Sequence, residues 1–387
     1  MANERGTLRR RREAAEAAEA AGIPYERDNE ALRRRRNPEE TCTNGDVCLF
    51  FTVVPCTVTS IICLFLFSAA LIAHRPAPPI DVEAVEADGM RWVHSADGTR
   101  VIEYGVCGDT DGTPIYFQHT YGGTGKIPLS EAHCKLWEEM HLRVISITMP
   151  GFGLSDAYPV GKIRTLKEWP SDVNQVLLKE SVDEFYAMGT SAGCIHVAAI
   201  AAAYPSRILG VAFASPTAPK EVEDQISGIS TATRVAKAML RMEYVGDLLA
   251  DFITNVVEPE DMMRYGTTDV GAAFDRLERE GKGHIVEHFL KDSRRAVKNT
   301  HRGWVDNIHV VMDDPPFNMT TVGKVAANGR RVVITTARDD TTNPPEFQKW
   351  FHAAIPGSTL LEFGEGYGHM HFAPMENFAK IVSSILL

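Results

Sequence analysis

The chain has 387 residues, of which 44% are hydrophobic and 24% charged, so it can bury a large core and is not an intrinsically disordered protein. Its formal net charge is −11 at pH 7. The first 46 residues contain ten arginines and ten acidic residues, so the net charge belongs to the rest of the chain. This balance disfavours nucleic acid and other anionic polymers as partners.

Residues 48–74 are predicted to form a single transmembrane anchor. The stretch from Cys48 to Ala73 has no charged side chain, and about 20 apolar residues are enough to cross a bilayer as a helix. The stretch is longer than the apolar region of a signal peptide and lies further from the start of the chain. A buried core helix is the alternative, but Pro55 and the lack of a polar face favour lipid.

Arginines set the expected orientation of this anchor. Ten of them lie in the N-terminal tail, residues 1–47, whereas Arg75 and Arg91 are the only ones soon after the anchor. The excess predicts a cytosolic N-terminus and a main domain in the lumen of the secretory pathway or outside the cell. In that orientation Asn318-Met-Thr320 becomes a usable glycosylation sequon.

Three of the seven cysteines, Cys107, Cys134 and Cys194, belong to the main domain. The others lie in or beside the predicted anchor. One disulfide would suit a lumenal domain, but buried free thiols are the simpler interpretation.

The chain after the anchor shows an alternation of strand and helix patterns. Residues 75–89 are rich in proline and acid and predict a linker, so the folded domain is expected over 90–387. An Asp-Gly pair between two apolar runs predicts an opening β-hairpin. The later strand runs are Pro114–His119, Arg143–Thr148, Glu184–Met188, Leu209–Ala214, Arg331–Thr336 and Thr359–Phe363. Helix-length segments separate several of them, which predicts an α/β fold with a mainly parallel sheet and helices on both faces.

The strand series is interrupted between about residues 216 and 328. Two long helical patterns appear there, Ala232–Val257 and Ala272–Lys298, and the strands resume at Arg331. The segment is interpreted as a helical cap inserted over the carboxyl edge of the sheet, where open α/β sheets bind ligands. A separate helical domain is the alternative.

The sequence GTSAG at 189–193 follows an apolar strand pattern and opens a helix. A serine on so sharp a turn has a strained backbone, and a Cβ at either flanking position would collide with the adjoining strand or helix. Gly189 and Gly193 leave that room. The context predicts that Ser191 is a nucleophile, with a plain serine in a tight turn as the alternative.

A serine hydroxyl needs a base within hydrogen-bond reach and a carboxylate that orients the base. His369 lies in a glycine-rich loop after the last predicted strand and is the preferred base, with His371 as the fallback. Asp340 follows the strand at 331–336 and is the preferred acid, whereas Asp339 is expected to cap or brace the turn.

An oxyanion formed at Ser191 needs backbone N–H donors. The expected donors are Ala192, which follows the nucleophile, and Tyr121, which lies in the loop after an earlier strand. Cys194 and His196 are interpreted as packed helix residues, and Asp172 as an acid on a helix surface.

The region from about Met90 to Leu387 resembles the α/β-hydrolase superfamily, in its capped esterase and lipase-like branch. The resemblance is carried by HTYGGTG at 119–125, MPGFGLSD at 149–156, GTSAG at 189–193, and the pair ARDDTTNPP and GYGHMHF near the C-terminus. Two positions depart from the family pattern. Thr120 replaces a glycine beside the oxyanion loop, and Ala337 replaces a glycine at the start of the acid loop.

The resemblance implies acyl transfer to Ser191 with His369 as the base and Asp340 holding the imidazole, followed by hydrolysis of the acyl-enzyme. No metal or organic cofactor is implied. The predicted anchor suggests a lipophilic ester substrate, such as a monoacylglycerol. The alternatives are a catalytically silent binding module of the same fold and an acyltransferase that uses an acceptor other than water.

Overall fold

The computed structural model describes residues 76–386 with gaps at 160–161, 163, 227–230 and 243–244, and a few positions between 60 and 71. The predicted anchor at 48–74 therefore lies almost wholly outside the described residues. Within them, no helix combines the length and the apolar character that a membrane crossing requires.

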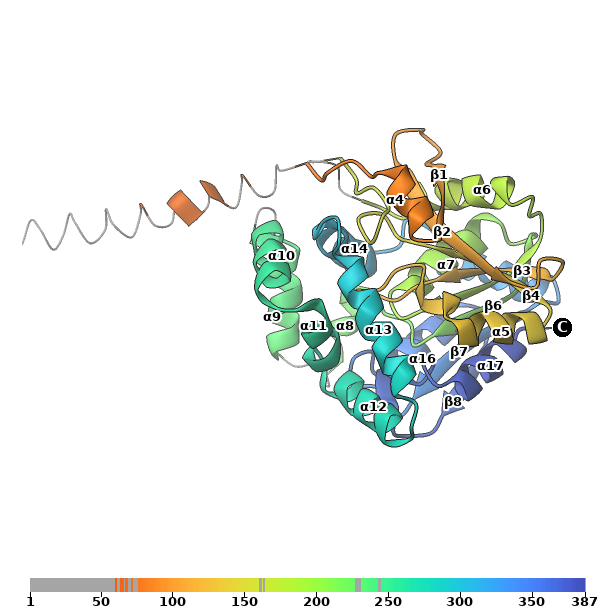
Figure 1. The fold of residues 1–387 in the computed structure, drawn as a ribbon. Helices are drawn as coiled ribbons and strands as arrows, with labels where there is room; N and C mark the ends of the chain where they lie inside the picture. The colour runs from red at the N-terminus through yellow and green to blue at the C-terminus, as the bar shows by residue number, and fades with distance from the viewer. Residues whose placement is uncertain are drawn as a thin grey trace, which may run out of the picture. The chain divides into compact units, whose positions relative to one another are not determined.

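One eight-stranded sheet organises the domain (Figure 1). The strands are β1 (Arg91–His94), β2 (Val101–Gly108), β3 (Thr113–Gln118), β4 (Leu142–Ile147), β5 (Phe185–Thr190), β6 (Ile208–Ala214), β7 (Arg331–Ala337) and β8 (Thr359–Phe363). Their order across the sheet is β1-β2-β4-β3-β5-β6-β7-β8. Strand β2 runs in the opposite direction to the other seven strands. Strands β3 to β8 therefore all end at one common edge. This agrees with the mainly parallel sheet that the apolar runs predict.

Helices cover both faces of the sheet, as expected for buried parallel strands. They are α5 (Glu131–Glu139), α6 (Trp169–Lys179), α7 (Gly193–Ala203), α16 (Pro345–Ala354) and α17 (Met375–Ser383). Apolar side chains of α6, α7 and α16 share one core cluster with the sheet, and those of α5 and α17 share the other. Helix α7 is apolar all round and is almost completely buried, which fixes its first turn against the strand ends.

Residues between β6 and β7 form a helical insertion, defined here as helices α8 to α15. Its elements are α8 (Lys220–Glu223), α9 (Thr231–Leu240), α10 (Val245–Val256), α11 (Pro259–Tyr265), α12 (Thr268–Arg279), α13 (Gly283–Ala296), α14 (Arg302–Met312), the 3-10 turn η3 (Met319–Thr321) and α15 (Gly323–Ala327). Figure 1 shows α9 to α14 together at one side of the sheet.

Each of the two long helical patterns in this insertion is divided into two helices. The pattern at 272–298 is broken by Gly281, whose φ of +75° ends α12, and the N–H of Lys282 bonds back to the carbonyl of Leu277 at 2.8 Å. Such a left-handed residue after a helix is the usual glycine stop. The pattern at 232–257 is likewise divided into α9 and α10. The first break has a local signal in the two glycines at 281 and 283, whereas apolar residues continue through the second break at 241–244 and concealed it.

The segment at 75–89, expected to be a linker, contains helix α4 (Val82–Ala87). Asp81 caps this helix by accepting a hydrogen bond from the N–H of Glu83 at 3.0 Å. The Val85 side chain is fully buried against Met90 and Leu154. The folded domain therefore starts before residue 90, because Val85 and the ion pairs of Asp88 fix this segment against the rest of the domain.

Two further expectations are corrected by the structure. Cys107 of β2 and Cys134 of α5 form a disulfide, whereas Cys194 is a buried free thiol. Asp172 is buried instead of lying on a helix surface, and it accepts a hydrogen bond from the Arg100 guanidinium at 2.6 Å. Both pairs join residues far apart in the sequence, so local patterns do not reveal them.

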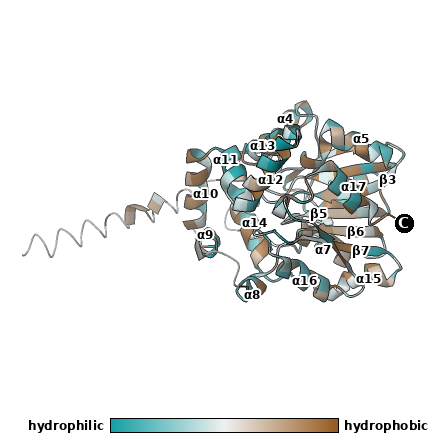
Figure 2. Cartoon of the chain, turned by 90° about the horizontal axis from the view of Figure 1, so that it is seen from below, coloured by the Kyte–Doolittle hydropathy of each residue, from teal (hydrophilic) through white to brown (hydrophobic). Residues whose placement is uncertain are grey.

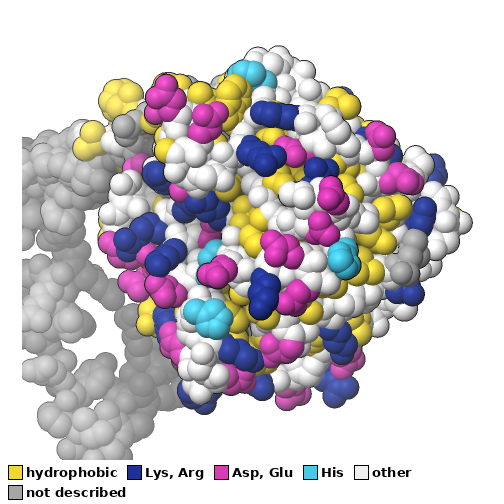
Figure 3. All heavy atoms as spheres, turned by 45° about the vertical axis from the view of Figure 1, so that its right-hand side comes forward, with side chains coloured by type: hydrophobic (Ala, Val, Ile, Leu, Met, Phe, Trp, Pro, Cys, Tyr) yellow, Lys and Arg dark blue, Asp and Glu magenta, His cyan; other side chains and the backbone are white. Residues whose placement is uncertain are grey.

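Charged side chains of both signs are spread over the face of the domain drawn in Figure 3, without a broad region of a single sign.

Candidate active site

The site residues follow the carboxyl ends of four neighbouring strands. Ser191 follows β5, Ser215 follows β6, Asp340 follows β7, and His369 lies in the 3-10 turn η4 (Gly368–Met370) after β8. Because these strands are parallel and adjacent, their ends lie side by side. Four segments separated in sequence are thus brought to one edge of the sheet.

Ser191 lies at a strained turn between β5 and α7. Its φ is +50°, a left-handed conformation that is uncommon for a residue other than glycine. A Cβ on Gly189 would lie 2.8 Å from the Gly193 carbonyl oxygen, and a Cβ on Gly193 would collide with the carbonyl oxygens of Gln118 and His119. The two glycines therefore allow strand, turn and helix to approach closely enough for the serine to adopt this conformation.

The structure brings Ser191, His369 and Asp340 into one hydrogen-bonded chain. His369 Nε2 lies 3.0 Å from Ser191 Oγ, and His369 Nδ1 lies 3.2 Å from Asp340 Oδ2. A carboxylate beside Nδ1 favours the tautomer with its proton on that nitrogen, which leaves Nε2 free to accept the serine proton. All three side chains are at least nine-tenths buried.

Ser215 is a fourth member of this chain. Its hydroxyl donates to Asp340 Oδ2, and its oxygen lies 3.0 Å from His369 Nδ1. The other carboxylate oxygen of Asp340 accepts a hydrogen bond from the N–H of Asn343 at 2.7 Å. The acid is therefore held at both oxygens, with its plane fixed relative to the imidazole.

The alternatives to Asp340 and His369, namely Asp339 and His371, have other hydrogen-bond partners. Asp339 accepts hydrogen bonds from the N–H groups of Gly366 at 2.5 Å and Gly368 at 3.2 Å, so it braces the histidine loop. His371 turns away from Ser191, and its Nε2 lies 2.7 Å from Thr335 Oγ1. Burial lowers the pKa of His371 to about 4, so that it is neutral at physiological pH.

The pKa of His369 is raised above its ordinary value. Burial alone lowers it, but the charge and hydrogen bond of Asp340, together with the charge of Asp269, outweigh the burial. The site thus stabilises the imidazolium that forms when the histidine accepts a proton.

The two predicted oxyanion donors, Ala192 and Tyr121, lie on neighbouring segments at the carboxyl edge of the sheet. Ala192 precedes α7, so its N–H is among the groups at a helix start that have no intrahelical acceptor. The close approach of Gly193 to the end of β3 places the loop that contains Tyr121 beside the serine turn. The Tyr121 hydroxyl donates to the Trp304 carbonyl at 3.0 Å, which ties this loop to α14.

Acidic side chains of the helical insertion accept hydrogen bonds from the loops of the site. Asp269, near the start of α12, accepts hydrogen bonds from the N–H groups of Thr341 at 2.9 Å and His369 at 3.2 Å. One carboxylate thus joins the acid loop to the histidine loop. On the other side, Asp292 of α13 accepts a hydrogen bond from the N–H of Thr124 at 2.6 Å.

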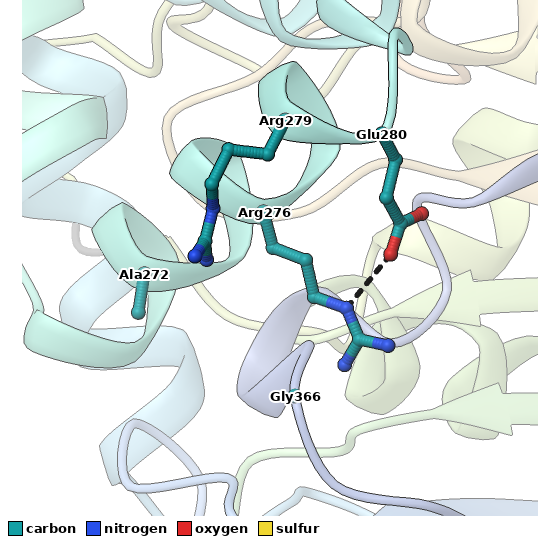
Figure 4. A pocket seen from close by; sticks show the side chains of 5 residues that line it. All are labelled: Ala272, Arg276, Arg279, Glu280 and Gly366. Carbon is teal, nitrogen blue, oxygen red and sulfur yellow. Dashed lines mark hydrogen bonds and ion pairs between the residues drawn. The ribbon is translucent and has the colours of Figure 1, made fainter.

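A hollow of about 570 Å³ lies outside the histidine loop, between that loop and α12. Figure 4 shows Arg276 pointing toward Glu280 across it, with Gly366 of the loop below. The hollow is not lined by Ser191, His369 or Asp340, so it is separate from the serine. Among the residues that the structure describes, no group of three or more His, Cys, Asp or Glu side chains is placed to hold a metal ion.

Ser215 and Asp269 are the site residues that the sequence did not reveal. Ser215 carries one available signal, its position directly after a predicted strand. Asp269 carries none, because an acid in the first turn of a helix is common for reasons of helix stability alone.

The alpha/beta hydrolase fold family matches residues 113–373 of this chain, which include the serine turn, the acid loop and the histidine loop. The chain therefore belongs to the alpha/beta hydrolase fold family. No curated protein sequence matches the chain.

Solved structures with a similar fold include three enzymes from microorganisms. An esterase from Rhodococcus sp. is 20% identical, with a TM-score of 0.55 over 76% of this chain and 97% of that one. A structure from a study of carboxylesterases of Nitrososphaera gargenis is 16% identical, with a TM-score of 0.55 over 76% and 96%. An enol-lactonase from Burkholderia xenovorans is 16% identical, with a TM-score of 0.52 over 76% and 98%. At these identities the likeness concerns the fold.

Proposed function

We propose that the protein is a membrane-anchored serine hydrolase that cleaves a carboxylic ester. The observation that carries the proposal is the chain of contacts from Asp340 through His369 to a strained Ser191. Proteins of similar fold include an esterase and a structure from a study of carboxylesterases, which supports the same class of reaction.

In the proposed first step, Ser191 Oγ attacks the ester carbonyl carbon while its proton passes to His369 Nε2. Asp340 stabilises the resulting imidazolium, and the N–H groups of Ala192 and Tyr121 are the proposed donors to the oxyanion. Collapse of the intermediate breaks the bond to the alcohol, which leaves with the proton from His369. Water then attacks the acyl-enzyme with His369 as base, which releases the acid and restores the serine.

The proposed location is the lumenal or extracellular side of a membrane, with residues 48–74 as the anchor. The disulfide between Cys107 and Cys134 supports an oxidising compartment. Asn318 is exposed, so its sequon is accessible to glycosylation. A domain anchored at a bilayer would meet lipophilic esters, and a monoacylglycerol or a similar acyl lipid is the proposed substrate class.

Hydrolysis of soluble aryl esters with short and long acyl chains tests this function. Ser191→Ala and His369→Ala are each expected to lower kcat/KM by about 10³-fold or more. Ser181→Ala is the matched control, because Ser181 is exposed and also has a positive φ, +54°, but lies outside the site. A folded native protein that turns over none of the esters would contradict the proposal and favour a silent binding module.

A further inference from the structure

Apolar side chains are exposed on one side of the helical insertion. Among the described residues from 76 to 386, every exposed large hydrophobic side chain except Leu178 lies on α9, α10, α11 or the turns that follow them. Those that are more than half exposed form what is called here the outer face: Val235, Met242, Phe252, Val256 and Tyr265. Figure 2 shows brown, apolar segments along α10. Exposed apolar side chains gathered on consecutive helices indicate a binding surface.

Pro78, near the start of the described domain, lies close to this same side. The Pro78 carbonyl accepts a hydrogen bond from Asn299 Nδ2 at 3.2 Å, and the N–H of Ile80 donates to Asp156 Oδ1 at 3.3 Å. Two residues after Asn299, His301 Nδ1 lies 3.4 Å from Asp251 Oδ1 of α10. Asp251 directly precedes Phe252, so the attachment point lies close to the outer face.

The covalent distance between the anchor and the domain is short. Three residues lie between His74, the last residue of the predicted anchor, and the fixed Pro78. The four steps from His74 to Pro78 span at most about 14 Å when the chain is fully extended. An anchored domain would therefore stay at the membrane surface, and its nearest helices would face lipid headgroups.

The charged side chains beside the outer face indicate whether docking on a bilayer requires anionic lipid. The basic side chains of α9 and of the turn after it are already paired: Lys237 contacts Glu223 at 2.6 Å, and Arg234 and Arg241 each contact an aspartate. Attraction to anionic lipid is therefore weak, and burial of apolar side chains in the interface is the available driving force.

We infer that the outer face of α9 to α11 docks on the lipid bilayer to which the chain is anchored, an inference that rests on the anchor proposed above. Helix α11 connects this face with the site. Tyr265 is exposed on α11, whereas a Cβ on Gly122, in the loop that contains Tyr121, would lie 3.6 Å from Met263 Cε of the same helix. A lipophilic ester leaving the bilayer would thus meet α11 before it meets Ser191.

Tryptophan fluorescence of the full chain in phosphatidylcholine vesicles tests the docking. Phe252→Trp places an indole on the outer face, and Leu178→Trp places one on α6; the native side chains are 59% and 62% exposed, so the two variants are matched. Brominated acyl chains are expected to quench the fluorescence that Phe252→Trp adds to the native signal and to leave the Leu178→Trp increment unchanged.

Three other results would overturn the inference. If the fluorescence that Phe252→Trp adds is not quenched although the protein floats with the vesicles, the docking is rejected and the anchor is retained. If the signal is unquenched and the protein forms oligomers, a second copy of the chain covers the outer face instead of lipid. Protein that does not float with vesicles would reject the anchor and the docking together. Turnover of a soluble aryl ester, measured in parallel, tests the proposed hydrolase function separately and shows that both variants are folded.

Discussion

At the scale of single residues, the imidazole of His369 is controlled by two carboxylates with different tasks. Asp340 contacts Nδ1 directly, whereas Asp269 contacts the backbone N–H of His369 and acts on the ring through its charge. Burial by itself raises the pKa of Asp269, but hydrogen bonds from Thr342 and the charge of His369 outweigh it and lower the pKa. Asp269 is therefore a positioning residue that reaches the site from the insertion.

Asp269→Asn should move the acid limb of the pH–activity profile to lower pH. The neutral imidazole is the base, so activity rises as His369 loses its proton, and removal of a nearby negative charge lowers its pKa. The amide oxygen can still accept the backbone hydrogen bonds, so plateau kcat/KM should stay within about tenfold of native. The measurement is kcat/KM against pH for a soluble ester.

Asp261→Asn, on the exposed surface of α11, is the control and should leave the profile in place. An acid limb for Asp269→Asn that coincides with that of the native protein would show that the Asp269 charge does not act on His369.

At the scale of elements, the glycine stop between α12 and α13 can be tested with two neighbouring glycines. Gly281 has a φ of +75° with open space around its Cα, so Gly281→Ala is strained by backbone conformation alone and should lower the free energy of unfolding by about 1–2 kcal/mol. Gly283 begins α13, so Gly283→Ala should leave stability unchanged or raise it by up to about 1 kcal/mol. Urea unfolding measures both; equal effects would contradict the assignment of the stop.

The disulfide joins β2 to α5 and closes a loop of 27 residues. Loop-closure entropy predicts that the double variant Cys107→Ser with Cys134→Ser loses about 3 kcal/mol of unfolding free energy. Cys63→Ser, which removes a free cysteine of the proposed anchor outside the folded domain, is the control. A double variant as stable as the control would show that the bridge does not stabilise the domain.

The elements also show how far the sequence could predict this structure. Strands, the serine turn and the order of serine, acid and histidine have local signals, namely apolar runs, paired glycines and loops after strands. The disulfide, the Arg100–Asp172 pair and the reach of Asp269 depend on contacts between distant segments, so no local pattern predicts them. Helix α4 was missed because only Val85 of that segment is buried.

For the molecule as a whole, we propose a hydrolase domain on the lumenal or outer side of a membrane. If the protein is made in eukaryotic cells, Asn318 should carry a glycan, because the sequon is exposed and would face the glycosylation machinery. Enzymatic removal of N-glycans should increase gel mobility in the native protein and have no effect on Asn318→Gln. Digestion of the domain by protease added to the cytosolic side of intact microsomes would reverse the proposed orientation.

If His369 activates Ser191 as a nucleophile, a reagent specific for activated serines should label Ser191 covalently. The full-length protein would be treated with a fluorophosphonate and the modified peptide located by mass spectrometry, alongside Ser191→Ala, His369→Ala and the Ser181→Ala control. We expect an adduct on Ser191 in the native and Ser181→Ala proteins, and no adduct in Ser191→Ala or His369→Ala. A folded native protein without an adduct, or with one on another serine, would contradict it.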